Sequence, residues 1–289
     1  MFDSTSLPES APLWFASPDD ILNFESAPRA SLHANFRVRV RVSVILPFFN
    51  EAKNAERTTA AVNEFAAANP EYHFIFVDDG STDGTAQVLA EHIQATGRRP
   101  KIELLRLERN GGKGRALREA LSRCLGEFVC FTDGDLPYTL DHLHLLGRGL
   151  AEHHVVIGSR VLGEGRGGGA ARRFYGSGFN FVVRSILGLE FGDTQAGLKG
   201  LRRDVAEHLF GLQRIDGFAF DAELLFLARK FGYRIAEIPA RLSDSHAYNA
   251  SPRRLVVDAS RMFREVATIR RNDLLGLYRR GPSRVERAA

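Results

Sequence analysis

The sequence predicts an α/β protein in which helices flank a mostly parallel, doubly wound sheet. Two observations support this prediction. Short apolar segments of strand length alternate with stretches of helical spacing through the first half of the chain. Clusters of acidic residues and glycines also follow three of these apolar segments. Because ligands of such sheets bind at the carboxyl ends of the strands, the same pattern indicates where a functional site should lie.

The predicted strands are short apolar runs. The first begins as an alternation of Arg and Val at residues 37–42 and becomes wholly apolar at Val44–Leu46, which is typical of a strand entering the sheet interior. The further strands predicted in the first half are His73–Val77, Ile102–Leu107, Phe128–Phe131 and Val155–Ile157.

Stretches with helical spacing separate these strands. The predicted helices of the first half are Asn54–Ala68, Thr85–Thr96, Lys113–Leu125 and Leu140–Glu152. The second half is less regular. Its predicted elements are a helix at Phe174–Leu189, a strand at Leu198–Arg202, a helix at Phe220–Phe231 and a strand at Arg234–Ile238.

The chain shows no internal repeat and no clear linker, so one domain with appended ends is predicted at residues 37–248. Residues 1–36, rich in Ser, Pro, Ala and Asp, are expected to form an N-terminal arm. Residues 249–289 are expected to form a basic amphipathic helical segment. Gly158–Gly178 holds eight glycines and four arginines, which predicts a mobile basic loop.

Composition excludes several classes of protein. With 44% hydrophobic and 26% charged residues, the 289-residue chain is neither disordered nor fibrous. Its two cysteines, Cys124 and Cys130, cannot form a disulfide framework and favour a reducing compartment. We find no signal peptide and no run of 18 apolar residues, so we expect a cytoplasmic protein, soluble or peripheral to a membrane.

The net charge of +4 is unevenly distributed. Residues 251–289 hold ten Arg against four Asp and Glu, or +6, so the rest of the chain carries −2. A GC-rich genome would also explain why 34 of the 39 basic residues are Arg, although not where they lie. No aromatic residues alternate with a basic stripe, so nucleic acid is not an expected partner. The placement favours an anionic membrane surface.

Polar and acidic residues follow three predicted strands. Pro47–Glu51 follows the first, Asp78–Thr85 the second and Thr132–Asp135 the fourth. Carboxylates gathered at one sheet edge repel one another, and a divalent cation with a bound diphosphate relieves this repulsion, because Mg²⁺ combines one or two carboxylates with phosphate oxygens. Each cluster alone is also ordinary turn and cap chemistry. Three clusters at three strand ends predict a metal–diphosphate site.

These motifs resemble those of the family-2 glycosyltransferases, which adopt the A-type glycosyltransferase fold and use a nucleotide-sugar donor. Pro47–Glu51 is similar to that family's opening motif, and Asp78–Asp83 to its base- and ribose-binding acidic turn. Asp133-Gly134-Asp135 resembles its metal-binding Asp-x-Asp, and Asn110–Ala116 its Gly-Lys-Gly turn; the match covers about residues 43–245. The resemblance implies donor binding by Pro47, Asn50, Glu51, Asp78, Asp79, Ser81 and Lys113, and coordination of Mg²⁺ or Mn²⁺ by Asp133 and Asp135.

Within that family the chain looks most like the polyprenyl-phosphate (dolichyl-phosphate) glucosyl- and mannosyltransferases. Gly158–Arg160, Asp193–Gly200 and Gly217–Leu225 carry this likeness. Some mannosyl members have Gln two residues after the second metal-site Asp, where this chain has Pro137, so coordination should lean on Asp133, phosphate and water. UDP-glucose and GDP-mannose are both compatible donors, and the Asp193–Gly200 motif favours UDP-glucose.

The resemblance implies inverting, metal-dependent transfer of a hexose to a polyprenyl phosphate at the inner, cytoplasmic face of the membrane. A cation held by Asp135, with Asp133 beside it, would stabilise the departing diphosphate. A phosphate monoester is already anionic at neutral pH, so it needs cationic positioning more than a base. Arg160, with Arg172 or Arg173, offers guanidinium forks for that purpose. Gln195 is expected to shape the acceptor or sugar pocket, unless it belongs to a polar turn.

Two other functions stay open. If the acceptor is a soluble or saccharide hydroxyl, Asp221 or Glu223 would be the general base, although both residues also suit an exposed helix start. Alternatively, the protein is a non-catalytic nucleotide-sugar-binding subunit. The apolar stripe of residues 253–271 either lies in a membrane interface or packs on its own domain. A membrane-protein partner or a homo-oligomer is compatible with either function.

Overall fold

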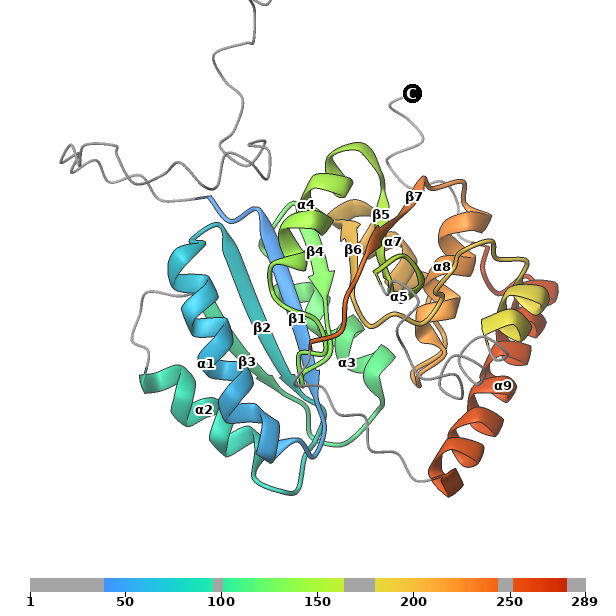
Figure 1. Ribbon diagram of the computed structural model, residues 1–289. Coiled ribbons are helices and arrows are strands. Elements are labelled where there is room, and N and C mark those ends of the chain that lie inside the picture. The colour runs from blue at the N-terminus through green and yellow to red at the C-terminus, as the bar shows by residue number, and fades with distance from the viewer. Residues whose placement is uncertain (1–38, 96–100, 164–179, 244–251, 280–289) are drawn as a thin grey trace, which may run out of the picture. The chain divides into compact units, whose positions relative to one another are not determined.

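A computed structural model describes residues 39–95, 101–163, 180–243 and 252–279 (Figure 1). The predicted N-terminal arm, most of the Gly/Arg loop, Arg172 and Arg173 lie outside these ranges. In the part of the chain that the structure describes, no helix is both long enough and apolar enough to cross a bilayer.

Seven strands form a single sheet in the order β3-β2-β1-β4-β6-β5-β7. Every neighbouring pair is parallel except those of β6, which runs antiparallel to β4 on one side and β5 on the other. The mostly parallel sheet is therefore confirmed, with one reversed strand that periodicity does not reveal. The strands are β1 Val42–Phe48, β2 Tyr72–Asp78, β3 Lys101–Arg106, β4 Phe128–Phe131, β5 Val155–Ser159, β6 Lys199–Arg202 and β7 Ile235–Pro239.

Helices cover both faces of the sheet, as the doubly wound prediction requires (Figure 1). Alternate strand residues face opposite layers: Ile45 and Ile75 enter the core beneath α3, α7 and α8, whereas Leu46 and Phe74 face the α1 side. The helices are α1 Ala52–Ala68, α2 Thr85–Ala95, α3 Lys113–Ala120, α4 His142–Glu152, α5 Arg160–Gly163, α7 Arg203–Leu212, α8 Phe220–Lys230 and α9 Pro252–Leu274; residues 180–187 are also helical.

Several element boundaries differ from those predicted. Residues 39–41 are not in a strand: β1 begins at Val42, where register with β2 and β4 begins together. The helix predicted to reach Leu125 ends at Ala120 and passes through a 3₁₀ turn, because Cys124 is already extended as it leads toward β4. In both places the contacts with neighbouring strands set the element boundary, although the strand or helix pattern continues further in the sequence.

Helix α9 packs on the rest of its domain with part of its apolar stripe. Val266 and Ile269 are fully buried. Lys230 Nζ lies 2.5 Å from Asp273 Oδ1, which ties the end of α8 to α9. Of the two expectations for this stripe, packing on its own domain therefore holds at these buried positions.

Candidate active site

Three sequence motifs meet at one edge of the sheet because β2, β1 and β4 are adjacent. Phe48 at the end of β1 is paired with Asp78 at the end of β2, and the Asp79 N–H donates to the Phe48 carbonyl at 2.9 Å. After β4, the Thr132 N–H donates to Ile45 of β1. The carboxyl ends of parallel strands thus bring segments 30 to 87 residues apart into one site, as the sequence predicts.

The predicted donor residues after β1 and β2 hold each other in place. Asn50, in the left-handed region at φ 54°, accepts the Thr82 N–H on its amide oxygen at 2.9 Å, and its own N–H donates to Ser81 Oγ. The Glu51 N–H donates to Thr85 Oγ1 at 2.9 Å, which joins the starts of α1 and α2. Pro47 precedes this turn as the sixth residue of β1.

Asp79 fixes the Gly111-Gly112 turn that precedes α3. Its two carboxylate oxygens accept the N–H groups of Gly111 and Gly112 at 2.9 and 2.8 Å. Burial raises the pKa of Asp79, although these two N–H groups oppose the shift. Gly112 has φ +96°, and a Cβ there would overlap the Asp216 carbonyl oxygen. Both oxygens of Asp79 are therefore committed to the protein itself.

Asp78 differs from its neighbour because one oxygen lacks a hydrogen bond. Its side chain is fully buried, and Oδ1 accepts the Ser81 N–H at 3.2 Å. Oδ2 has no hydrogen-bond partner among the described residues, and Arg106 Nε lies 3.6 Å away. Buried carboxylate oxygens ordinarily find a donor, and this oxygen, which is closed to solvent, would accept a ligand N–H only once the surrounding side chains move.

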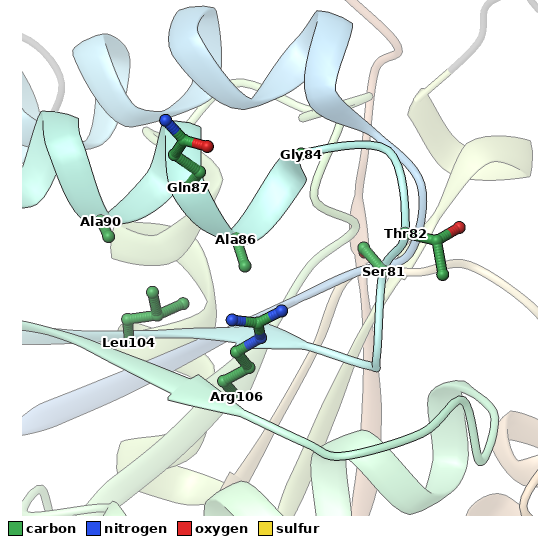
Figure 2. A pocket seen from close by; sticks show the side chains of 8 residues that line it. All are labelled: Ser81, Thr82, Gly84, Ala86, Gln87, Ala90, Leu104 and Arg106. Carbon is green, nitrogen blue, oxygen red and sulfur yellow. The ribbon is translucent and has the colours of Figure 1, made fainter.

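A pocket adjoins this acidic turn, between α2 and the edge strand β3 (Figure 2). Arg106 lies on its β3 side, and Ala86 and Ala90 of α2 point toward the same space, whereas the Gln87 side chain points away from Arg106. Arg106 connects the pocket to Asp78. The remaining lining residues are Ser81, Thr82, Gly84, Ala86, Ala90 and Leu104.

Two lysines and two aspartates form a charged cluster at the centre of the edge. Lys113 Nζ lies 2.6 Å from Asp133 Oδ1 and 3.9 Å from Asp221 Oδ2. Lys199 Nζ donates to Asp221 Oδ1 at 2.6 Å and to the Ala196 carbonyl. The cluster joins the Gly-Lys-Gly turn, the Asp-Gly-Asp motif, β6 and α8, which are separate in sequence. Its two positive and two negative charges balance.

The pKa shifts follow from burial and from these pairings. Burial alone would lower the pKa of Lys113, but the Asp133 and Asp221 carboxylates outweigh it and raise that pKa. Burial also opposes ionisation of Asp133, yet Lys113, with Lys199 and Arg160, lowers its pKa. Lys199 behaves differently: burial lowers its pKa despite the adjacent Asp221. Lys113 and Asp133 are therefore an ion pair at neutral pH.

Lys199 was not among the residues that sequence reasoning selected. It lies in a short antiparallel strand and is fully buried under the site. A lysine within the otherwise apolar and glycine-rich stretch of residues 196–201 was the available signal, because lysine is almost never fully buried without a partner. The partner, Asp221, lies 22 residues further along the chain.

Two side chains of α1 hold the Asp-Gly-Asp motif by hydrogen bonds to its backbone carbonyls. Thr58 Oγ1 donates to the Gly134 carbonyl at 2.7 Å, and Arg57 Nη2 to the Asp135 carbonyl at 2.9 Å. The other oxygen of Asp133, Oδ2, lies where a Cβ on Gly197 would be. Among the described residues, no three His, Cys, Asp or Glu side chains cluster as a complete metal cage. Two carboxylates suit a cation that takes its other ligands from phosphate and water.

Asp193 binds Arg160, the predicted acceptor residue. Arg160 Nε and Nη2 donate to the two oxygens of Asp193 at 2.6 and 2.9 Å, which is a bidentate fork. The Arg160 side chain remains 40% exposed, so it stays accessible at the site. Gln195 Nε2 lies 2.9 Å from the Met262 sulfur of α9, so α9 forms one wall beside the predicted acceptor residue.

Asp221 and Glu223 are both buried, contrary to the expectation of an exposed helix start. Asp221 belongs to the charged cluster. Glu223 accepts the N–H groups of Arg214 and Ile215 and the Tyr278 hydroxyl, so it anchors the loop before α8 and the chain after α9. Burial raises the pKa of Glu223 against the effect of these donors. Its position is structural, and it lies away from the charged cluster.

Solved structures share this fold. The glucosyl-3-phosphoglycerate synthase of Mycobacterium tuberculosis, crystallised with Mn²⁺, UDP and glucosyl-3-phosphoglycerate, superposes with a TM-score of 0.59 at 21% identity over 80% of each chain. The same protein with Mg²⁺ and UDP gives a TM-score of 0.58. At this identity the similarity concerns the fold alone, and it confirms the predicted A-type glycosyltransferase fold.

Similar sequences include proteins named dolichyl-phosphate beta-glucosyltransferase. A Trichomonas vaginalis protein named dolichyl-phosphate beta-glucosyltransferase ALG5C is 30% identical over 71% of this chain and 64% of its own length. The human dolichyl-phosphate beta-glucosyltransferase is 29% identical over 71% of this chain and 68% of its own. The Dictyostelium discoideum protein of that name is 27% identical over 94% and 88%.

The family model that matches the chain is "Glycosyl transferase family 2", over residues 43–210. That range is more than half of the chain and includes β1, β2, β4 and the motifs that meet at their ends. This chain therefore belongs to glycosyl transferase family 2 and is a glycosyltransferase.

Proposed function

We propose that this protein transfers glucose, with inversion, from UDP-glucose to a polyprenyl phosphate at the cytoplasmic face of a membrane, using Mg²⁺ or Mn²⁺. The observation that carries the proposal is the charged cluster in which Lys113 bridges Asp133 and Asp221. This cluster connects Asp133, which is suited to a cation and diphosphate, with β6 and the start of α8, which lie beside the loops suited to an acceptor. The names of the relatives support the sugar and the lipid.

Asp78 favours uracil as the donor base. Uracil offers a single N–H between two carbonyls, whereas guanine offers two adjacent N–H donors that engage both oxygens of one carboxylate. Asp78 Oδ1 already accepts the Ser81 N–H, so only Oδ2 is left for a base. One remaining acceptor fits the single donor of uracil. Arg106, 3.6 Å from that oxygen, is positioned to face the carbonyls.

Asp133 and Asp135 would hold the divalent cation. When bound, this ion would act as a Lewis acid that stabilises the negative charge of the departing diphosphate. Lys113 now pairs with Asp133 and is the cation nearest that carboxylate. With Asp133 engaged by the ion, the Lys113 ammonium group would be available to bind a phosphate oxygen. Gly197 keeps the Asp133 carboxylate in position because it adds no side chain.

A phosphate acceptor fits the state of Asp221. Its oxygens face the ammonium groups of Lys199 and Lys113, so it supports the cluster rather than an incoming hydroxyl. A phosphate monoester is already anionic at neutral pH and needs no base. Arg160 would position it, with its guanidinium plane set by Asp193. Arg172 and Arg173 stay predictions, since they lie outside the described residues.

Membrane contact would use the exposed parts of α9 and of helix 180–187. Phe181 and Phe263 are exposed aromatic residues, 69% and 49% accessible. Arg261 and Arg264 are exposed on α9 beside Phe263. Apolar rings among arginines suit the interface of an anionic bilayer. The contact would bring Gln195, which touches α9, near a lipid-borne acceptor.

The direct test supplies labelled UDP-glucose and GDP-mannose separately, with polyprenyl phosphate and Mg²⁺ or Mn²⁺. We expect a lipid-linked glucose from UDP-glucose alone and its loss on chelation of the metal. Asp135→Ala should lower the rate at least about 100-fold, since a cation stabilises transition-state charge by several kcal/mol. Asp141→Ala is the matched control, because this exposed Asp makes no side-chain cap bond.

The outcomes separate the competing functions. Product from GDP-mannose alone contradicts the assignment of uracil to Asp78. Transfer to a soluble sugar but not to the lipid phosphate contradicts the acceptor. Full activity in Asp135→Ala removes the metal role of that residue, and binding of UDP-glucose without any transfer by the parent supports a binding subunit instead.

A further inference from the structure

A second pocket lies at the C-terminal end of α9, beyond the part of the helix that contacts the loops of the active site. Residues 185–188, the end of α8 and the end of α9 enclose it. In Figure 1 the helix at 180–187, in yellow, lies beside α9, in red, on one side of the molecule. The lining residues are Ser185, Ile186, Leu187, Gly188, Phe226, Arg229, Lys230, Arg270 and Asp273.

Positive charge exceeds negative charge in this pocket. Arg229, Lys230 and Arg270 contribute three cations, and Asp273 the one acidic lining residue. Asp273 pairs with two of them, at 2.5 Å from Lys230 and 3.3 Å from Arg270. The third, Arg229, is 3.8 Å from Glu190, a side chain that is 86% exposed and weakly held in solvent. An excess of guanidinium and ammonium groups favours a phosphate ligand.

The same pocket also has apolar walls and an apolar border. Ile186, Leu187 and Phe226 line it beside the cations. Leu274 and Leu275, directly after the lining residue Asp273, are 73% and 60% exposed. A free anion would leave these exposed leucines in water, whereas the acyl chains of a lipid would bury them. The combination points to the headgroup of a lipid.

The pocket is separate from the active site, although one helix reaches both. Met262 contacts Gln195, and Glu265 accepts the Ala219 N–H at 3.0 Å, so the middle of α9 touches the catalytic loops. Arg270 lies eight residues beyond Met262, which is about 12 Å along a helix. A ligand in this pocket therefore does not occupy the sugar-transfer site.

We propose that the pocket between helix 180–187, α8 and α9 binds the phosphate of an anionic phospholipid headgroup. Arg229 and Arg270 bind the phosphate, and Leu274 and Leu275 insert among the acyl chains of the adjoining lipids. The bound lipid fixes the end of α9 at the membrane surface. The inference does not depend on which sugar or acceptor the active site uses.

The test compares binding to vesicles of phosphatidylcholine with binding to vesicles that contain about 30 mol% phosphatidylglycerol, at about 0.15 M salt. The pocket variant is Arg229→Gln with Arg270→Gln. The matched control is Arg39→Gln with Arg123→Gln, which removes the same charge from exposed positions that neither line the pocket nor lie on α9.

We expect the parent to prefer the anionic vesicles. The pocket variant should lose about 30-fold in affinity for the anionic vesicles, and the control less than about threefold. The reason is that a phosphate bound in the pocket depends on Arg229 and Arg270, whereas diffuse attraction does not depend on which arginines are removed. Equal losses in both variants would mean diffuse surface attraction and overturn the proposal. So would a parent that binds both vesicles equally. Circular dichroism and thermal midpoints of both variants establish that they fold.

A second arm separates the lipid from free phosphate. If millimolar inorganic phosphate raises the thermal midpoint of the parent but not of the pocket variant, while vesicle binding is the same for both, the ligand is a soluble phosphate and the lipid assignment fails. A third arm measures transfer to a short, water-soluble prenyl phosphate. The pocket variant should match the parent there, and failure of the parent itself would count against the proposed function without affecting the vesicle result.

Discussion

At Gly197 the absence of a side chain makes room for the Asp133 carboxylate. A Cβ at this position would overlap Asp133 Oδ2. The displaced carboxylate would lose its place beside Lys113 and, in the proposed mechanism, beside the cation. A single methyl group at the site would therefore act on the reaction rather than on the fold.

We expect Gly197→Ala to lower the transfer rate by about 100-fold or more, since a misplacement of about 1 Å costs that much in an enzyme. The measurement is initial rate with saturating UDP-glucose, alongside a thermal melt. Gly192→Ala is the matched control in the same loop: its added Cβ meets Glu237 and Ser159 at ordinary contact distances of 3.4 and 3.5 Å. A similar loss in both variants would contradict the specific clash.

Asp78 and Asp79 show how adjacent carboxylates acquire different tasks. Asp79 is saturated by the N–H groups of Gly111 and Gly112, whereas Asp78 keeps one buried oxygen without a hydrogen bond among the described residues. The sequence offers both as donor ligands. Only the turn geometry distinguishes the residue that shapes the site from the residue available to a base.

At the scale of the elements, α9 is held by a hydrogen bond from the chain that follows it. Tyr278 is buried, and its hydroxyl donates to Glu223 Oε1 at 2.5 Å. Because Glu223 also holds the Arg214 and Ile215 N–H groups, the same carboxylate connects the end of α9 to the loop that precedes α8. Undocking α9 would disturb the start of α8, where Asp221 lies.

Tyr278→Phe should lower the free energy of unfolding by about 1–3 kcal/mol, the cost of leaving a buried polar group short of a partner. Urea unfolding measures this change. In a Glu223→Gln background the same substitution should cost less, because the charged acceptor is gone. An identical cost in both backgrounds would contradict a direct bond between the two side chains.

For the whole molecule, one buried and two partly buried histidines make stability depend on pH. Burial lowers the pKa of His73, His144 and His154. The unfolded chain, with histidines near 6.5, therefore binds more protons than the folded chain in this range. The free energy of unfolding is therefore largest at high pH, and it falls as the pH drops below about 6.5. Burial raises the pKa of Asp79 and Glu223, which opposes this trend at lower pH.

We expect the urea midpoint to fall between about pH 8 and pH 5.5. His73 is almost fully buried in β2, so His73→Gln isolates its share: the fall should become smaller in this variant. The comparison is made relative to each protein's own value at pH 8, where histidine is neutral in both states. An unchanged fall would mean that His73 does not contribute.

Local sequence is sufficient for much of the fold and the site. Periodicity predicts β4 at its observed bounds and places β2, β3, α1 and α4 within two residues, because apolar runs and helical spacing mark these elements in the sequence. The motifs at Asp78 and Asp133 lie at one edge because parallel strands end together. The reversed direction of β6 and the early end of α3 depend on neighbouring strands and have no local signature.

Neighbouring residues are therefore enough to predict the alternating strands and helices, the strand-end motifs and the basic end of the chain. The contact of Lys113 with Asp133, the burial of Lys199 beside Asp221 and the position of α9 between the active-site loops and a cationic pocket emerge only when the chain is folded. The reason is physical. Periodicity and turn chemistry are properties of neighbouring residues, whereas an ion pair or a pocket depends on distances between elements far apart in the chain, which only the packed sheet fixes.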